Sequence, residues 1–153
     1  MRKLIFTLAF IATMVSTASA QNKRNAIGFR YGNGGEFTYQ RFLGSSTRLE
    51  VDLGVNSWNA GSGDTGTCLT GIYQWVWDIN KSDTGFKWYL GVGPQFGILK
   101  DGNALGALGQ LGLEYNFKIP LHLSVDYRPG WYCLPRNFGG SFEDVSVSLR
   151  YRF

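Results

Sequence analysis

Histidine, cysteine and long apolar runs are scarce in this sequence, and their scarcity excludes several classes of protein. One histidine and two cysteines among 153 residues cannot supply the clustered ligands of a typical zinc site, so we expect no metal and no cofactor. Past residue 20, no uninterrupted apolar run approaches the roughly 20 residues that a membrane-spanning helix requires. The chain is therefore not a helical membrane protein.

Aromatic residues and glycine are abundant instead. The chain has 11 phenylalanines, eight tyrosines, five tryptophans and 21 glycines, whereas charged residues make up 17%. Disorder requires few aromatics and a large net charge, so this chain is folded. The long segments mix glycine, aromatic and β-branched residues, which form helices poorly, and this excludes a helix bundle. The length suits one domain and is too short for two ordinary ones.

The first twenty residues have the three parts of a secretory signal. Arg2 and Lys3 form a positive start, Leu4–Val15 is an apolar run, and a tripeptide of small residues ends at Ala20. We expect cleavage after Ala20, which leaves a single domain of residues 21–153. Cleavage leaves 13 basic and 11 acidic residues, a net charge of +2 in place of +4. The basic balance of the precursor therefore does not indicate nucleic-acid binding.

The rest of the chain alternates apolar and polar residues with a period of two, which is typical of β-strands. In the clearest segment, Leu49, Val51 and Leu53 alternate with charged residues. Turn-forming residues separate the alternating segments. We predict eight strands, at Ala26–Tyr31, Glu36–Leu43, Thr47–Trp58, Thr67–Ile79, Phe86–Lys100, Ala104–Lys118, Leu121–Cys133 and Phe142–Phe153.

This alternation fits two inverted structures, a soluble lipocalin-like barrel with an apolar core and a membrane barrel with an apolar outer wall. Three features of the segments favour the membrane barrel. Trp and Tyr lie near the ends of the apolar faces, as in interface girdles. The segment lengths suit strands tilted by about 45° across a bilayer. Their number is even, as in bacterial single-chain barrels. We therefore expect an all-β fold, an eight-stranded antiparallel up-and-down transmembrane β-barrel.

Charge balance on the polar faces is a fourth argument for the membrane barrel. Apart from Arg41, the charges of the strands fall on these faces, and seven basic residues match seven acidic ones. A closed lumen needs such a balance, because an unpaired buried charge costs several kcal/mol. The basic residues are Arg30, Arg48, Lys87, Lys118, Arg128, Arg150 and Arg152, and the acidic ones are Glu36, Glu50, Asp52, Asp78, Glu114, Asp126 and Asp144.

An eight-stranded barrel is just wide enough for side chains to fill its interior. We predict an ion network in the half of the lumen nearer the expected periplasmic ends of the strands, an uncharged polar mouth above it, and no continuous aqueous pore. The predicted network comprises Arg30, Arg48, Glu50, Asp52, Glu114, Asp126, Arg128, Arg150 and Arg152. The predicted mouth comprises Gln74, Gln95, Gln110 and Tyr132.

The last strand ends with apolar residues at alternate positions, among them Val147, Leu149, Tyr151 and Phe153. With the signal and the eight segments, this ending resembles the small bacterial outer-membrane β-barrel proteins, the OmpA/OmpX-like and generic outer-membrane β-barrel families. In those families the barrel-assembly machinery reads such an ending. The resemblance implies a monomer in the bacterial outer membrane, in contact with lipid and lipopolysaccharide. The expected outer loops are shorter than those of OmpX-like adhesins, which argues against adhesion by protruding strands.

His122 and Ser124 are candidates for catalysis, because a general base beside a hydroxyl can form an acyl-transfer site. Their spacing is similar to the His-x-Ser of the eight-stranded lipid A 3-O-deacylases. Two features argue against this activity. Both side chains are expected to face the lumen near the periplasmic turns, and Val125 stands where that family has asparagine. A lumenal histidine without a catalytic role is the better interpretation.

Cys68 and Cys133 are predicted near the outer ends of the fourth and seventh strands. A disulfide would persist in an exported chain, but these strands are not neighbours. The alternation of inward and outward side chains along a strand, which we call parity, places Cys68 inside and Cys133 outside. A bridge would require the Cys133 segment to fold over the mouth. Two free thiols are the favoured interpretation, and the bridge is the alternative.

The sequence leaves three roles open. The favoured one is a structural or interaction role in the cell envelope for a packed barrel that is neither an enzyme nor an open porin. The second is a barrel that binds a small ligand in the uncharged part of the lumen. The third is a lipid A-modifying hydrolase that uses His122 and Ser124.

Overall fold

The computed structural model describes residues 24–58, 64–79, 85–99, 102–134 and 139–153. The expected signal peptide at residues 1–20 lies outside these ranges. Within them, no helix is long and apolar enough to cross a membrane. The described chain folds into ten strand segments: β1 Asn25–Tyr31, β2 Gly34–Phe42, β3 Thr47–Trp58, β4 Asp64–Asp78, β5 Phe86–Leu99, β6 Gly102–Asn116, β7 Leu121–Tyr127, β8 Gly130–Leu134, β9 Gly139–Ser141 and β10 Val145–Arg152.

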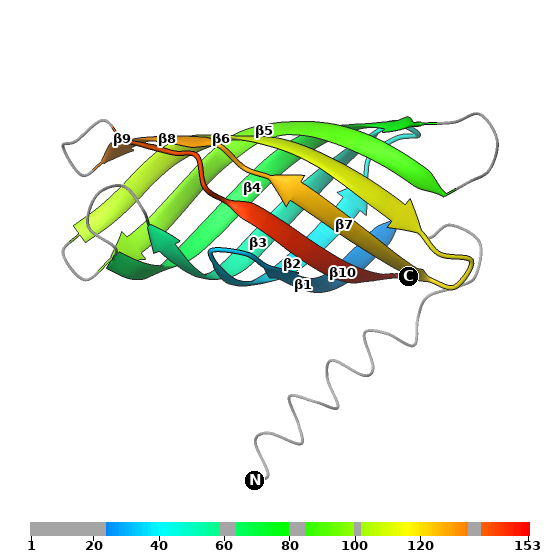
Figure 1. The fold of residues 1–153 in the computed structure, drawn as a ribbon, viewed down its shortest axis with the longest axis horizontal. Coiled ribbons are helices and arrows are strands. Elements are labelled where there is room, and N and C mark those ends of the chain that lie inside the picture. Colours follow the sequence, from blue (N-terminus) through cyan, green and yellow to red (C-terminus); the bar gives the residue numbers. More distant parts are fainter. Residues whose placement is uncertain (1–23, 59–63, 80–84, 100–101, 135–138) are drawn as a thin grey trace, which may run out of the picture.

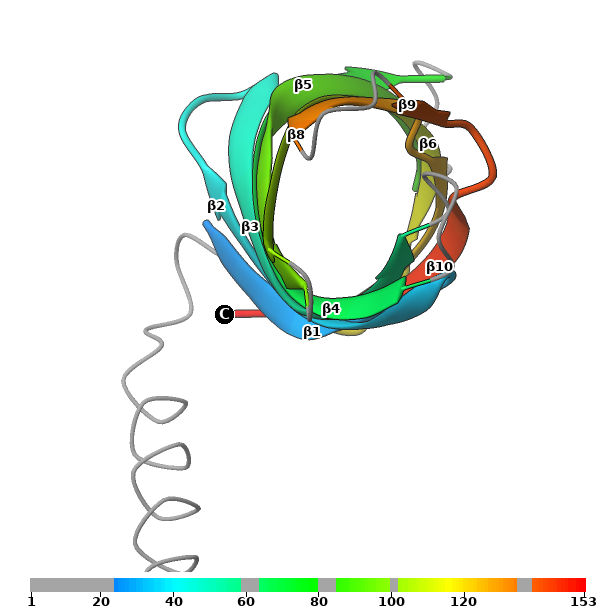
Figure 2. The ribbon, with the colours of Figure 1, turned by 90° about the vertical axis from the view of Figure 1, so that its left-hand side faces the viewer.

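The ten segments form eight antiparallel barrel strands. β8 continues β7 past Pro129, whose nitrogen carries no hydrogen to donate, and both segments pair with β6 in one register up to a shift between Gly106 and Leu105. β9 continues β10, because β9 pairs with β8 while β10 pairs with β7. Pairing between β1 and β10 and between β5 and β6 closes the sheet into a cylinder, which Figure 2 shows end-on. The predicted eight-stranded antiparallel barrel is confirmed.

The observed strand bounds depart from the predicted ones mainly near the loops. The third strand has the predicted bounds, Thr47–Trp58. The fourth starts three residues earlier than predicted, at Asp64, so part of the segment expected to be a loop extends the barrel wall. The last strand starts at Val145, three residues later than predicted, and a separate segment, β9, lies before it in the stretch predicted to be a loop.

The ends of the described chain meet at one end of the cylinder. The amide of Phe153 donates to the carbonyl of Asn25 at 2.9 Å, and the amide of Asn25 donates back at 3.2 Å. We call this the terminal end, and the end that bears the β1–β2 turn the opposite end. Figure 1 shows the C-terminus beside the turn that joins β6 to β7.

The strands are staggered around the cylinder. The residue row from Glu114 passes through Ser124, Ser148, Arg30, Glu36, Gly54, Cys68 and Gly97 and returns to β6 at Ala104, ten residues away. A stagger of this kind forces the strands of a barrel to tilt. It also places residues of one paired row at different heights in the lumen.

The apolar faces of the strands point outward and the polar faces point inward. Tyr31 and Phe37 are 68% and 70% exposed, whereas Arg48, Glu50 and Arg150 are 0% exposed. A soluble lipocalin-like barrel has the opposite arrangement, so that alternative is wrong. The inversion follows from the period of two, which places every second residue of a strand on the same side of the wall.

Aromatic side chains form bands on the outer wall near both ends. At the terminal end, Trp77 stacks on Trp88 with ring centroids 4.4 Å apart, and Phe86 lies 4.6 Å from Tyr115. Near the opposite end, Trp131 and Phe142 meet edge to face at 5.1 Å. The predicted clustering of aromatics near strand ends is therefore found on β4, β5, β6 and β8.

We predict that Gly93→Ala destabilises the barrel and that Gly71→Ala does not. A methyl group at Gly93 would lie 1.8 Å from the carbonyl oxygen of Gly71, whereas one at Gly71 would have no atom within 4 Å. Overpacking of this kind costs about 1–3 kcal/mol or more. The temperature at which the folded band is lost in a heat-modifiability gel measures the effect, and equal temperatures for both variants would contradict the assigned register.

Candidate functional site: the ion network in the lumen

Four arginines and six carboxylates are buried in the lumen. Each arginine is 2% exposed or less, and the acids are at most 7% exposed. All barrel strands except β4 and β5 contribute residues to this set, either from the strand itself or from the segment next to it. The buried ions are Arg30, Arg48, Arg128 and Arg150, with Glu36, Glu50, Asp52, Glu114, Asp126 and Asp144.

The predicted balance of seven basic and seven acidic residues inside the barrel is wrong. Lys87 and Asp78 form a pair at 2.9 Å with side chains 28% and 67% exposed. Lys118 is exposed in the turn after β6, and Arg152 is only partly buried. These residues lie at or beyond the rim, where parity no longer determines burial. Acids therefore outnumber arginines in the buried network.

Arg128 is the centre of the network. One of its terminal nitrogens contacts the carboxylates of both Glu50 and Asp52, the latter at 2.6 Å, and the other lies 3.3 Å from Glu36. Its backbone amide donates to the carbonyl of Asp144 at 2.8 Å. Arg128 follows β7 immediately and precedes Pro129, so the interruption of the strand places this side chain across the lumen.

Arg30 and Arg150 extend the network towards the two ends of the barrel. Arg30 binds Glu36 at 3.0 Å, Asp126 at 3.1 Å and Asp144 at 3.0 Å. Arg150 donates to Glu50 at 3.0 Å. Glu36 and Asp144 belong to the set of polar-face acids but not to the predicted network, although their parity already placed them on the lumenal side.

Arg48 connects the network to β4, β5 and β6. It donates to Gln74 and Glu114, and its guanidinium lies 4.7 Å from the centre of the Tyr89 ring, a cation–π distance. Gln74 in turn donates to Gln110. The hydroxyl of Tyr89 donates to Asp126 at 3.1 Å, which returns the chain of contacts to the ions of Arg30.

Gln74 and Gln110 therefore belong to the ion network, and their prediction as part of an uncharged mouth is wrong. Gln74 pairs in register with Arg48, and Gln110 pairs with Gly91 on the next strand. Gln110 also donates to Glu50 at 3.2 Å. Height in the lumen depends on the stagger between strands as well as on position along a strand, so position alone does not give it.

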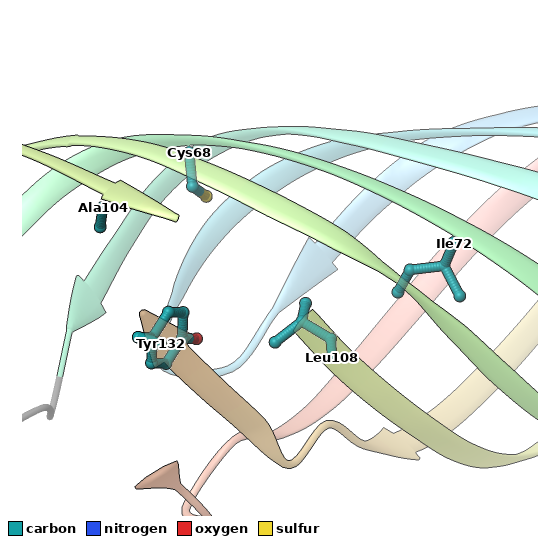
Figure 3. Close-up of a cluster of buried hydrophobic side chains, with 5 residues drawn as sticks. All are labelled: Cys68, Ile72, Ala104, Leu108 and Tyr132. Atoms are coloured by element: carbon teal, nitrogen blue, oxygen red, sulfur yellow. The ribbon is translucent and has the colours of Figure 1, made fainter. Parts of the chain in front are cut away.

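Gln95 and Tyr132 do lie together above the network. The Tyr132 hydroxyl donates to Gln95 at 2.8 Å, and Gln95 donates to Thr70 at 2.9 Å. Tyr132 also belongs to an apolar cluster that the sequence analysis did not identify, shown in Figure 3. Parity could have identified its members, because each stands two positions along the strand from another residue that faces the lumen. The cluster comprises Cys68, Ile72, Ala104, Leu108 and Tyr132.

His122 and Ser124 are both buried in the lumen, but they do not form a catalytic pair. Neither ring nitrogen of His122 has a hydrogen-bond partner. The Ser124 hydroxyl accepts a hydrogen bond from Arg150 at 2.7 Å. A serine whose hydroxyl is held by a guanidinium and has no contact with the imidazole lacks the activated proton transfer that acyl-transfer catalysis requires.

Cys68 and Cys133 are free thiols, one buried and the other exposed. Cys68 donates to Glu36 at 3.2 Å inside the barrel, while Cys133 lies on the outer side of β8. The alternative of a disulfide between them is therefore wrong, because the wall separates them as parity indicated. Within the described ranges, no group of three or more His, Cys, Asp or Glu side chains is arranged to hold a metal ion.

No family model and no curated protein matches the sequence, but solved structures of similar shape exist. The N-terminal β-barrel domain of Pseudomonas aeruginosa OprF aligns with a TM-score of 0.60 and 14% identity, over 84% of this chain and 95% of that one. Neisserial surface protein A aligns with a TM-score of 0.55 and 14% identity, over 84% and 93%. A transmembrane β-barrel designed de novo aligns at 0.55 and 15%, over 89% and 100%. At these identities the likeness is one of fold alone.

We predict that Arg128→Met lowers the stability of the folded barrel by about 3–5 kcal/mol, because it leaves buried carboxylates without their partner. Lys87→Met is the matched control, since it breaks a largely exposed pair worth at most about 1 kcal/mol. Urea unfolding of both variants in the same detergent, followed by tryptophan fluorescence, measures the difference. Equal midpoints would show that Arg128 does not hold the network together.

Proposed function

We propose that the chain is an integral outer-membrane β-barrel with a closed lumen and a structural or interaction role in the cell envelope. The observation that carries this proposal is the inverted distribution of side chains, with buried ions inside and exposed aromatic and aliphatic residues outside. A hydrocarbon solvent stabilises such a wall, and a closed sheet satisfies all backbone groups within it. The solved barrels of similar fold support the same location.

The lumen supports a barrel that does not conduct ions. Arg128, Arg30, Arg150 and Arg48 reach across the interior to carboxylates on other strands. An eight-stranded barrel has room for side chains but little more. In this proposal the ions are part of the packing, and the protein acts through its outer wall and rims.

The alternative of a small-ligand site loses its main support. Of the four residues expected to line such a site, Gln74 and Gln110 are bound into the ion network, and Gln95 and Tyr132 bind each other. The hydrolase alternative is weakened as well, because His122 and Ser124 share no hydrogen bond. We further propose export through the N-terminal signal, insertion by the barrel-assembly machinery through the ending at Phe153, contact with lipid and lipopolysaccharide, and a monomeric state.

We predict that Leu111→Arg blocks stable membrane insertion. Leu111 is 51% exposed and lines an apolar groove on the outer wall together with Leu113 and Val125. A charge at the bilayer midplane costs about 2–4 kcal/mol in a membrane barrel, whereas on a surface in water it changes little. Cell fractionation and a heat-modifiability gel give the readout. Leu111→Met is the control, and a Leu111→Arg variant that is folded, soluble and free of membranes would overturn the proposed location.

We predict that the purified barrel produces no stable single-channel steps in planar bilayers, because the ion network closes the lumen. An open porin reconstituted under the same conditions is the positive control, and the heat-modifiability gel confirms that the sample is folded. Reproducible conductance from folded protein would overturn the closed lumen while leaving the membrane location intact.

A further inference from the structure

The exposed cations of the described residues gather at the terminal end of the barrel. Arg24, Arg41 and Lys118 are exposed, and all three lie at this end. Arg152 is partly buried there, with its guanidinium 5.3 Å from the centre of the Phe42 ring. At the opposite end, the exposed charged side chain among the described residues is the acid Glu143.

Backbone hydrogen bonds place these four cations on one continuous sector of the rim. The amide of Arg152 donates to the carbonyl of Pro120 at 2.8 Å, which joins β10 to the turn that contains Lys118. Phe153 and Asn25 join β10 to β1, and the amide of Phe42 donates to the carbonyl of Arg24 at 2.7 Å, which joins β1 to β2. We call Arg24, Arg41, Lys118 and Arg152 the rim cations.

Arg41 and Lys118 have no acidic partner in the part of the chain that the structure describes. Among the described residues, no carboxylate lies within ion-pair distance of either one. The acids nearest to them in the sequence, Glu36 and Glu114, are buried in the lumen, where Arg30 and Arg48 bind them. Lys87 differs, because Asp78 already neutralises it at 2.9 Å.

The unpaired cations adjoin the apolar outer wall. Lys118 lies between Phe117 and Ile119, which are 41% and 58% exposed, and Arg41 is two residues from Leu43, which is 53% exposed. Long basic side chains in such a position lie along the apolar surface and extend their charged groups to its edge. A cation at the edge of an apolar wall matches a molecule that has an anionic head and a hydrocarbon tail.

We propose that Arg41 and Lys118, at the edge of the apolar wall, bind the phosphate headgroups of anionic phospholipids in the leaflet at the terminal end. The proposal rests on the membrane location proposed above. Each basic residue near an anionic lipid surface contributes about 1 kcal/mol, which corresponds to about a fivefold change in affinity. A zwitterionic headgroup has no net charge and gains little from the same sector.

Native mass spectrometry of the detergent-purified protein tests the proposal by titration with phosphatidylglycerol or phosphatidylcholine of the same acyl chains. We expect phosphatidylglycerol to bind at least about fivefold more tightly. The double variant Arg41→Gln, Lys118→Gln should abolish this preference, and Lys87→Gln should preserve it. Millimolar inorganic phosphate, compared with sodium chloride at equal ionic strength, tests whether a free anion displaces the lipid, and we expect no specific displacement.

Equal binding of the two lipids, or a preference that survives in the double variant, would overturn the proposal. Specific displacement by inorganic phosphate would also overturn it, because the sector would then be a site for a free anion. The substitutions are on exposed residues, and the heat-modifiability gel establishes that each variant is folded. A barrel that inserts into vesicles of both lipids without preference contradicts only this inference, whereas one that inserts into neither contradicts the membrane location itself.

Discussion

The pairing of buried guanidinium groups with buried carboxylates is the constraint on which the rest of the structure depends. A charge inside a narrow cylinder has little water around it, so it must be met by charges and hydrogen bonds from other strands. Arg128 illustrates this requirement, because it contacts acids on β2, β3 and β7. These contacts fix the strands relative to one another at the centre of the barrel, far from the turns.

The same pairing explains why the outer wall can be almost entirely apolar. Because successive side chains of a strand point to opposite sides, a slip of one residue would move the ions of that strand outside and its aromatic residues inside. The register that pairs Arg30 with Glu36 inside the barrel is therefore fixed together with the one that pairs Leu53 with Phe37 outside. One strand register thus determines both the lumen and the outer wall.

Much of the fold could be predicted from the sequence because the alternation is strict. Thr47–Trp58 has the predicted bounds because its charged and aliphatic residues alternate without interruption. The break at Pro129 and the strand at Gly139–Ser141 were missed, because short irregular segments carry little periodic signal. The departures at the ends of the other strands occur where glycine and polar turn residues blur the pattern.

The sequence predicted which residues form the candidate site better than it predicted how they are arranged. Parity identified the inward-facing ions, and all nine residues of the predicted network except Arg152 are buried. Parity could not give heights, because these depend on the ten-residue stagger, which no single strand encodes. Gln74 and Gln110 were misplaced for this reason. The excess of buried acids was also missed, because Lys87 and Lys118 share the polar parity but lie at the rim.

The join between β1 and β10 has a consequence for how the cylinder forms. Ala26 pairs with Arg152 and Tyr31 with Val147, so the first and last strands meet along a short ladder that cannot start until the whole chain is made. Until then, the growing sheet has two open edges with unsatisfied backbone groups, which is a state prone to aggregation. Until this seam closes, the outer edges of β1 and β10 have no partner strand, and closing it removes both edges at once.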